Sequence, residues 1–138
     1  MVDTVSVARR SEIMSRVRNK DTRPELYVRR LIHNAGFRYR LHVSKLPGRP
    51  DLVFPGRRKV IFVHGCFWHS HDGCHNARIP KSRADFWRSK LESNKERDER
   101  NMRTLMDEGW KVLVIWECEL RDPALLDRIK DFLEQRAD

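Results

Sequence analysis

Cysteine and histidine side chains are concentrated in one short segment, HGCFWHSHDGCH, at positions 64–75. The segment holds two of the three cysteines of the chain, and the third follows much later. Three cysteines and one histidine make a tetrahedral ligand set of the kind found in closed structural zinc sites. The set that this spacing predicts is Cys66, His71, Cys74 and Cys118. The alternative is that these cysteines are three separate buried thiols.

Two histidines of the same segment, His64 and His69, stay outside that ligand set and have Phe67 and Trp68 between them. An imidazole titrates close to neutral pH and can act as a general base. A loop that a metal stiffens, and that also presents spare histidines and flat aromatic rings, suggests a site that acts on a flat ligand.

Asp51 is a second candidate for chemistry. It follows Pro50 at the start of a short apolar run, and the next apolar run ends at Val63 and His64. Neighbouring strands would then bring a carboxylate close to an imidazole and a backbone carbonyl. Mg²⁺ binds one or two carboxylates together with phosphate oxygens and water, so this arrangement is sufficient for metal-assisted cleavage of a phosphodiester. The alternative is that Asp51 only caps a turn.

The charge of the chain is strongly positive and uneven. The net charge is +9, but residues 119–138 hold four Lys or Arg against six Asp or Glu, so residues 1–118 carry about +11. A compact basic domain is typical of nucleic-acid binding, because its cationic side chains neutralise phosphates and release counterions. The alternative is a basic protein that has no nucleic-acid partner.

The length predicts a single domain over residues 1–138, which includes a basic arm at residues 1–20. No signal peptide, transit sequence or transmembrane run is recognisable, and the odd number of cysteines argues against a disulfide framework. We therefore expect a monomeric cytoplasmic protein with reduced thiols and no membrane partner.

Three helices are expected from capping and periodicity. A capping box at residues 22–25 begins the first helix, which Gly36 ends. Ser82 caps a long, densely charged helix that Gly109 ends. The third is an amphipathic closing helix that begins at residues 122–123.

Strands are expected in the segments between these helices. Residues 37–43 alternate between apolar and polar side chains, as in a half-buried strand, and short apolar strands follow at 51–54 and 59–63. Residues 110–116 form a continuous apolar run of the fully buried, parallel kind. The order α-β-β-β-α-β-α predicts an α/β sandwich with a mixed sheet, in which 110–116 is the central strand.

Four stretches of the chain form longer motifs: LPGRPD at 46–51, VIFVHGCFWH at 60–69, FW at 86–87 and VIWEC at 114–118. Together, and in this order, they resemble the very-short-patch-repair (Vsr) endonucleases, and the resemblance runs from about Ser11 to Cys118. It implies a restriction-endonuclease-like fold of the PD-(D/E)XK type, with a mixed-sheet core flanked by helices and a structural zinc site.

The resemblance also implies a function. The expected enzyme is an Mg²⁺-dependent, strand-specific DNA nickase that cuts on the 5′ side of the thymine in a T:G mismatch during very short patch repair. Its expected partner is double-stranded DNA with such a mismatch, and other mismatch-repair proteins are further candidates. The expected location is the bacterial cytoplasm, on the nucleoid when DNA is bound.

Two alternatives to this function stay open. One is a related metal-dependent endonuclease of the same fold that cuts a different mismatch or another DNA structure. The other is a non-catalytic, zinc-stabilised DNA-binding module. Asp51 and His69 argue against the second alternative, because binding alone requires neither of them.

Catalytic roles follow from the resemblance residue by residue. Asp51 matches the aspartate that binds Mg²⁺, and the backbone carbonyl of Val63 would be the second protein ligand. His69 matches the general base that activates the attacking water, and His64 would assist at the metal-bound phosphate. Glu25 matches a glutamate that reaches the active site, although its position in the capping box explains it equally well.

The resemblance assigns the zinc ligands to Cys66, His71, Cys74 and Cys118. The segment before Cys74 is one residue longer here than in the family, at residues 72–73. His69 or His75 could therefore replace His71 as the ligand. His69 is needed as the base, however, and His75 lies outside the bracketing cysteines.

The residues that the resemblance implies as DNA contacts are Phe67, Trp68, Trp87, Lys90, Asn94 and Met14. The three aromatic side chains would wedge into the base stack beside the mismatch. Trp87, Lys90 and Asn94 share one helix face. The alternative is that Trp87 packs in the core and Lys90 is solvated. Trp110 and Trp116 are expected in the core.

Overall fold

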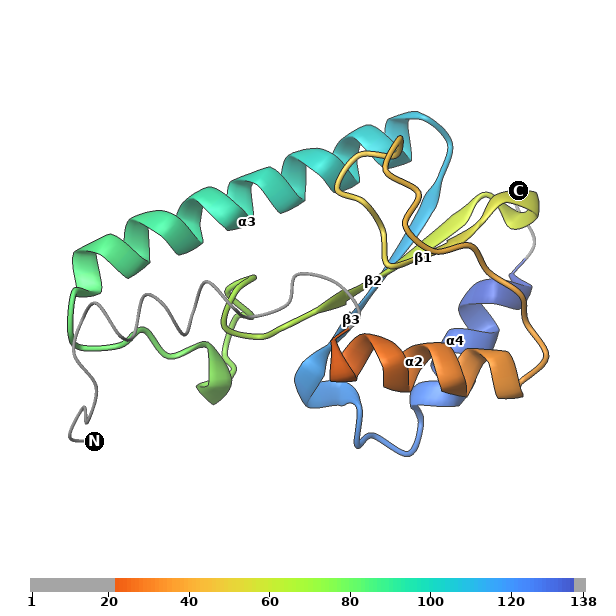
Figure 1. The fold of residues 1–138 in the computed structure, drawn as a ribbon, viewed down its shortest axis with the longest axis horizontal. Coiled ribbons are helices and arrows are strands. Elements are labelled where there is room, and N and C mark those ends of the chain that lie inside the picture. The colour runs from red at the N-terminus through yellow and green to blue at the C-terminus, as the bar shows by residue number, and fades with distance from the viewer. Residues whose placement is uncertain (1–21, 136–138) are drawn as a thin grey trace.

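The computed structural model describes residues 22–135, which fold as a mixed α/β structure (Figure 1). Its helices and strands are α2 (Arg23–Asn34), β1 (Leu52–Phe54), β2 (Lys59–His64), α3 (Ala84–Asp107), β3 (Lys111–Trp116) and α4 (Leu125–Glu134). Short 3₁₀ turns occupy Pro55–Arg57, His75–Ala77 and Glu117–Glu119. The expected basic arm at residues 1–20, including Met14, lies outside the described residues.

The strands of residues 22–135 form one mixed sheet in the order β1-β2-β3. β1 and β2 are antiparallel, and β2 and β3 are parallel with α3 as the crossover between them. The predicted mixed sheet is therefore present, but its central and fully buried strand is β2 and not residues 110–116. In β3 only Ile115 is buried. A continuous apolar run does not distinguish a central strand from its neighbour when helices cover both faces of the sheet.

Residues 37–43 do not form the predicted strand. Their only ladder contact among the described residues is one antiparallel bridge between Arg40 and Val53. The alternation of the side chains is nevertheless observed, because residues 37, 39, 41 and 43 are half-buried and the residues between them are exposed. His42 has a φ of 57°, which takes the backbone out of the extended conformation and prevents a longer ladder.

Two apolar clusters lie on opposite faces of the sheet, because successive strand residues point to opposite sides. Figure 1 shows α2 and α4 on one face and α3 on the other. The first cluster joins the sheet to α2 and α4 and contains Val28, Ile32, Leu52, Phe54, Ile61, Val63, Ile115, Leu125, Ile129 and Leu133. The second joins it to α3 and contains Val53, Val60, Phe62, Leu105 and Trp110. Trp110 is thus in the core, as predicted.

The helix ends agree with the sequence except at the starts of α3 and α4. Helix α4 begins at Leu125 and not at residues 122–123, which lie before it. The Thr22 side chain accepts a hydrogen bond from the Glu25 backbone N–H and caps α2, as predicted. Gly109 has a φ of +91° directly after the C-cap residue of α3, also as predicted. Ser82, however, does not cap α3: the N-cap is Arg83, which has a left-handed backbone and no side-chain capping bond. None of the helices in residues 22–135 is both long and apolar enough to cross a membrane.

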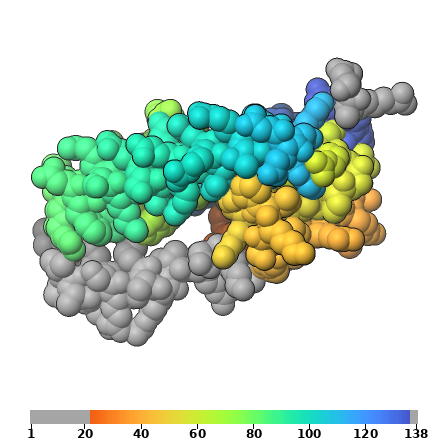
Figure 2. Space-filling model, turned by 90° about the horizontal axis from the view of Figure 1, so that it is seen from above, coloured from red at the N-terminus to blue at the C-terminus, as the bar shows by residue number. Residues whose placement is uncertain are grey.

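The loop before Asp51 packs closely on α3, as Figure 2 shows for the segment drawn in orange and yellow. A Cβ atom at Gly48 would lie 3.1 Å from Cβ of Asn101 and 3.2 Å from the Phe62 ring, and Gly48 has a φ of +76°. Glycine is therefore required there both for the backbone conformation and for the close approach. This packing fixes the entry of the chain into β1.

A buried cation caps the C-terminal end of α4. Lys59, the first residue of β2, is only 1% exposed. Its ammonium group donates to the backbone carbonyls of Phe132 at 2.5 Å, Leu133 at 3.1 Å and Gln135. The last carbonyls of a helix have no partners within the helix, so Lys59 satisfies them and complements the negative end of the helix dipole.

Candidate active site and metal centre

The candidate catalytic and metal-binding residues meet at one edge of the sheet, where β2 and β3 end. His64 and Trp116 end the parallel strands β2 and β3 and are direct register partners. Cys66 and Cys118 each follow two residues later, so the two strands deliver them to the same edge. Asp51 arrives there from the opposite direction, because it directly precedes β1, which is antiparallel to β2.

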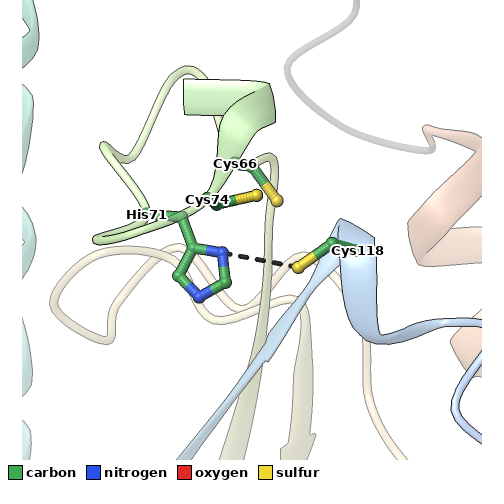
Figure 3. Close-up of side chains that lie close together, drawn as sticks. All are labelled: Cys66, His71, Cys74 and Cys118. Carbon is green, nitrogen blue, oxygen red and sulfur yellow. Dashed lines mark hydrogen bonds between the residues drawn. The ribbon is translucent and has the colours of Figure 1, made fainter. Parts of the chain in front are cut away.

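The four predicted zinc ligands lie together in the structure (Figure 3). The ligand atoms of Cys66, His71, Cys74 and Cys118 are all within 4.8 Å of one another. The Nδ1 atom of His71 is 3.4 Å from Sγ of Cys118. Among the described residues this cluster includes His71, and neither His69 nor His75 belongs to it. The longer segment before Cys74 therefore does not displace His71.

This cluster fits a tetrahedral metal ion. A zinc ion with Zn–S bonds of about 2.3 Å holds its ligand atoms about 3.8 Å apart, so small rotations of the side chains would close the set. Burial raises the pKa of the Cys66 thiol, and the adjacent Cys74 thiol adds to the rise. Thiolates at this position therefore require a compensating cation. The donor types, three sulfurs and one imidazole, are those that zinc prefers.

The half-buried Asp51 and the buried Glu25 form an acidic pair beside the end of β2. The Val63 N–H donates a hydrogen bond of 2.6 Å to Oδ2 of Asp51. Burial raises the pKa of Asp51 to about 7 against the effect of this bond, and the neighbouring Glu25 carboxylate raises it further. Two adjacent carboxylates that resist joint ionisation are a favourable environment for a divalent cation.

Glu25 belongs to both of the arrangements that its sequence position allows. Its backbone N–H is capped by Thr22 Oγ1 at 3.4 Å. Its side chain is only 6% exposed and forms an ion pair of 3.3 Å with Arg29, one helical turn later. The backbone of Glu25 thus serves the helix cap, whereas its carboxylate is directed to Arg29 and Asp51.

His64, His69 and Asp98 form a second cluster, with ligand atoms within 4.8 Å of one another. The two imidazole rings are stacked, with centroids 3.8 Å apart and planes 6° apart. Nδ1 of His69 lies 2.5 Å from Oδ2 of Asp98. The nitrogen lone pairs of two parallel rings lie in separate planes and cannot converge on one ion. This arrangement therefore fits proton transfer better than metal chelation.

His64 is held in its neutral form. Burial lowers the pKa of His64 to about 3, and the nearby His69 lowers it further. Its Nδ1 atom is buried and has no hydrogen-bond partner among the described residues. His64 can therefore donate or accept a hydrogen bond at neutral pH but does not carry a positive charge.

Asp98 is a functional candidate that sequence reasoning missed. It lies on α3, four residues after Asn94 and therefore on the same helix face, one turn further on. That spacing could have identified Asp98 from the sequence, because Asn94 and Trp87 already mark the face of α3 that is directed to the candidate site. The helix carries several other acidic residues, and the sequence does not show which of them faces a histidine.

The predicted DNA-contact residues within the described part of the chain gather where α3 meets the loop after β2. Phe67, Trp68 and Trp87 form a mutual aromatic cluster, with ring centroids 5.2 to 5.9 Å apart. Trp87 is 8% exposed and packs against the two half-buried loop aromatics. The Asn94 side chain donates to the Trp68 carbonyl at 3.3 Å, and Lys90 is exposed.

Comparison with known proteins agrees with the motifs of the sequence. Residues 2–76 match the model of the family described as DNA mismatch endonuclease Vsr. The chain is 52% identical to the type II nicking enzyme V.XorIIP of Xanthomonas oryzae pv. oryzae, over 97% of this chain and 98% of that protein. It is 40% identical to the DNA mismatch endonuclease Vsr of Escherichia coli, over 96% of this chain and 88% of that protein.

A third relative is the type II nicking enzyme V.NmeAIP of Neisseria meningitidis, which is 42% identical over 91% of this chain and 89% of that protein. Each of these three relatives matches over at least 91% of this chain. The chain therefore belongs to the Vsr family of DNA mismatch endonucleases. It is an endonuclease, as its motifs predict.

Proposed function

We propose that this endonuclease nicks one strand of duplex DNA on the 5′ side of the thymine in a T:G mismatch, within a PD-(D/E)XK-type core. The observation that carries the proposal is the line of contacts at the sheet edge. Asp51 is hydrogen-bonded to Val63, the next residue His64 stacks on His69, and His69 is bonded to Asp98. A half-buried carboxylate and an oriented imidazole are therefore both held near the C-terminal end of β2.

Asp51 and the Val63 carbonyl would hold Mg²⁺, with Glu25 close enough to act through its charge. When bound, Mg²⁺ supplies charge neutralisation at the scissile phosphate and lowers the pKa of coordinated water. The two carboxylates support this assignment, because their mutual repulsion in a buried site is relieved by a cation.

His69 is the general base in this proposal. When Nδ1–H of His69 donates to Asp98, the lone pair remains on Nε2, which can then take a proton from the attacking water. Asp98 also stabilises the imidazolium that this transfer creates. Neutral His64 is suited to a hydrogen bond with a phosphate oxygen.

Zinc in the Cys66, His71, Cys74 and Cys118 cluster is proposed as a structural ion. It would tie the loop after β2 to the turn after β3. Phe67 and Trp68 lie inside that loop and are proposed as the wedge that opens the base stack beside the mismatch, at a cost of a few kcal/mol. Trp87 supports the wedge, and Lys90 and Asn94 lie on the adjacent face of α3.

The proposal is tested with labelled duplexes that contain T:G, other mismatches or only matched pairs, incubated with Mg²⁺ and scored for strand-specific nicks. We expect a single nick 5′ to the thymine in T:G duplexes. Asp51→Asn should abolish it while mismatch binding is kept. Asp85→Asn is the matched control, because the Asp85 side chain is fully exposed at the start of α3. Preferential nicking at another mismatch would transfer the proposal to a related specificity.

A further inference from the structure

Contrary to the core position that the sequence predicts, Trp116 belongs to neither apolar cluster of the described residues. It is half-buried at the last position of β3, beside its register partner His64. Trp116 is thus part of the sheet edge at which both the metal cluster and the histidine pair are built.

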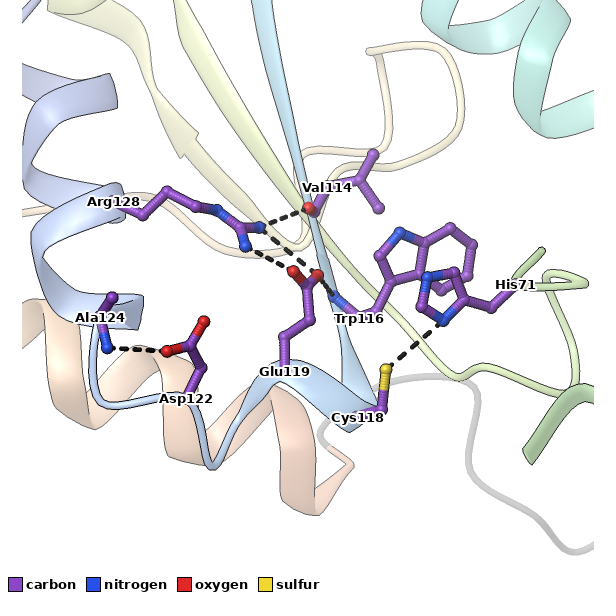
Figure 4. A network of polar contacts seen from close by, with 8 residues as sticks. All are labelled: His71, Val114, Trp116, Cys118, Glu119, Asp122, Ala124 and Arg128. Carbon is purple, nitrogen blue, oxygen red and sulfur yellow. Dashed lines mark hydrogen bonds and ion pairs between the residues drawn. The ribbon is translucent and has the colours of Figure 1, made fainter. Parts of the chain in front are cut away.

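The indole of Trp116 contacts one histidine from each of these two groups. The ring of His71 stacks on it, with centroids 4.1 Å apart and planes 7° apart (Figure 4). The ring of His64 meets it edge to face, with centroids 5.2 Å apart and an interplanar angle of 77°. His69 in turn stacks on His64. A continuous series of ring contacts therefore connects the metal cluster to the candidate base.

The orientation of the His64 ring depends on these contacts. Its Nδ1 atom has no hydrogen-bond partner among residues 22–135, so no bond at that atom fixes the rotation of the ring. The neighbours that hold the plane are rings: Phe62 at 5.5 Å, Trp116 at 5.2 Å and His69 at 3.8 Å between centroids. Of these, Trp116 is the one that also contacts a metal-cluster residue.

Trp116 itself is anchored from α4, as Figure 4 shows. Its backbone N–H donates to Oε1 of Glu119 at 2.8 Å. Arg128 binds the Glu119 carboxylate and also donates to the Val114 carbonyl at 3.1 Å. These bonds hold the end of β3 and the following turn, which carries Cys118, in one fixed arrangement.

We propose that Trp116 is a positioning residue that couples the metal cluster to the catalytic histidine pair. When the cluster is loaded, His71 is fixed by its ligand bond and holds the indole, and the indole holds His64 and through it His69. The zinc site then contributes to the reaction rate as well as to folding. This inference rests on the proposed role of His69 as base and of the cluster as a zinc site.

The test compares Trp116→Leu, Trp116→Phe and Trp110→Leu in the full-length, zinc-loaded protein. Leucine keeps an apolar side chain but removes the flat ring, and phenylalanine restores a smaller flat ring. Trp110→Leu is the matched control, because it removes a core indole that directly precedes the same strand, at the opposite end of the ladder from His64. Rates are compared at temperatures that give equal folded fractions.

We expect Trp116→Leu to lower the single-turnover nicking rate about ten- to a hundredfold, as for a small misplacement of a catalytic group, with an unchanged Kd for the T:G duplex. It should also accelerate zinc transfer to a chromophoric chelator. Trp116→Phe should recover most of both properties, and Trp110→Leu should change neither. A zinc-loaded Trp116→Leu protein that nicks like Trp110→Leu would overturn the proposal.

The imidazole NMR signals of His64 and His69 provide a readout that does not depend on nicking. Zinc removal from the parent protein should shift both sets of signals, and Trp116→Leu should abolish this response. If the parent protein does not nick T:G duplexes, the proposed function fails, but these signals still decide whether the coupling exists. A response that is equal in parent and Trp116→Leu excludes it.

Discussion

His69 and Asp98 are joined by a 2.5 Å contact between Nδ1 and Oδ2, which connects the loop after β2 to the middle of α3. The carboxylate fixes both the tautomer and the rotation of the imidazole. The candidate base is therefore oriented by a helix that also carries Trp87 and Asn94. Movement of α3 on DNA would act directly on the base.

The first prediction concerns this carboxylate. Asp98→Asn should lower the nicking rate by a hundredfold or more, roughly the contribution of a general base, because an amide can hold the wrong tautomer of His69. DNA affinity should be unchanged. Single-turnover nicking measures the effect, and Asp107→Asn, at the exposed end of the same helix, is the control. An undiminished rate in Asp98→Asn would make Asp98 a purely structural residue.

Much of the fold could be predicted from the sequence, because its signals are local. The Thr22 cap, Gly109 and the alternation at residues 37–43 each depend on a few adjacent side chains. The failures concern relations between distant segments. Asp98 lies 29 residues from His69, and nothing local shows that their side chains meet. The role of Trp116 depends on the register of β2 against β3, which an apolar run does not encode.

The second prediction concerns zinc. Purified protein should contain one equivalent of zinc, and Cys118→Ser should lose it and melt at a lower temperature. Cys118 is exposed, so the same substitution would hardly change the stability of a protein without a metal at this cluster. Elemental analysis and thermal melting before and after chelation measure both effects. Equal melting temperatures with and without the chelator would show that no metal at this cluster stabilises the protein.

The third prediction concerns pH and Mg²⁺. Burial raises the pKa of Asp51 to about 7, so below that pH the folded protein holds a proton that Mg²⁺ must displace. The ionised fraction rises about tenfold between pH 6 and pH 8, and the Mg²⁺ affinity should rise by the same factor. Calorimetry in two buffers of different ionisation enthalpy counts the protons released. Asp51→Asn should release none, whereas a pH-independent affinity in the parent would contradict the assignment.

The fourth prediction separates recognition from cleavage. Trp68→Ala should lower both the preference for T:G over T:A duplexes and the nicking rate, because Trp68 is the proposed wedge and its loop carries the base. His69→Ala should lower the rate alone. Binding and nicking assays on both duplexes, with a melting curve for each variant, distinguish the two effects. Full discrimination by Trp68→Ala would show that Trp68 is a packing residue.

The fifth prediction concerns the buried cation at α4. Lys59→Met keeps the length of the side chain but removes the donors to the carbonyls of Phe132, Leu133 and Gln135. We expect a loss of about 2 kcal/mol in the free energy of unfolding, as for a hydrogen-bonded charge whose acceptors stay behind. Urea unfolding measures it. Lys111→Met, at the half-buried position paired with Lys59 on β3, should cost much less.

The position of the Lys59 acceptors in the sequence has a further consequence for folding during synthesis. They lie 73 to 76 residues downstream, at the end of α4. During synthesis the central strand β2 leaves the ribosome long before those carbonyls exist, and a buried ammonium without acceptors is strongly unfavourable. We therefore expect β2 to reach its native, buried state only after the end of α4 has been synthesised, so that the sheet and α4 form in one cooperative step.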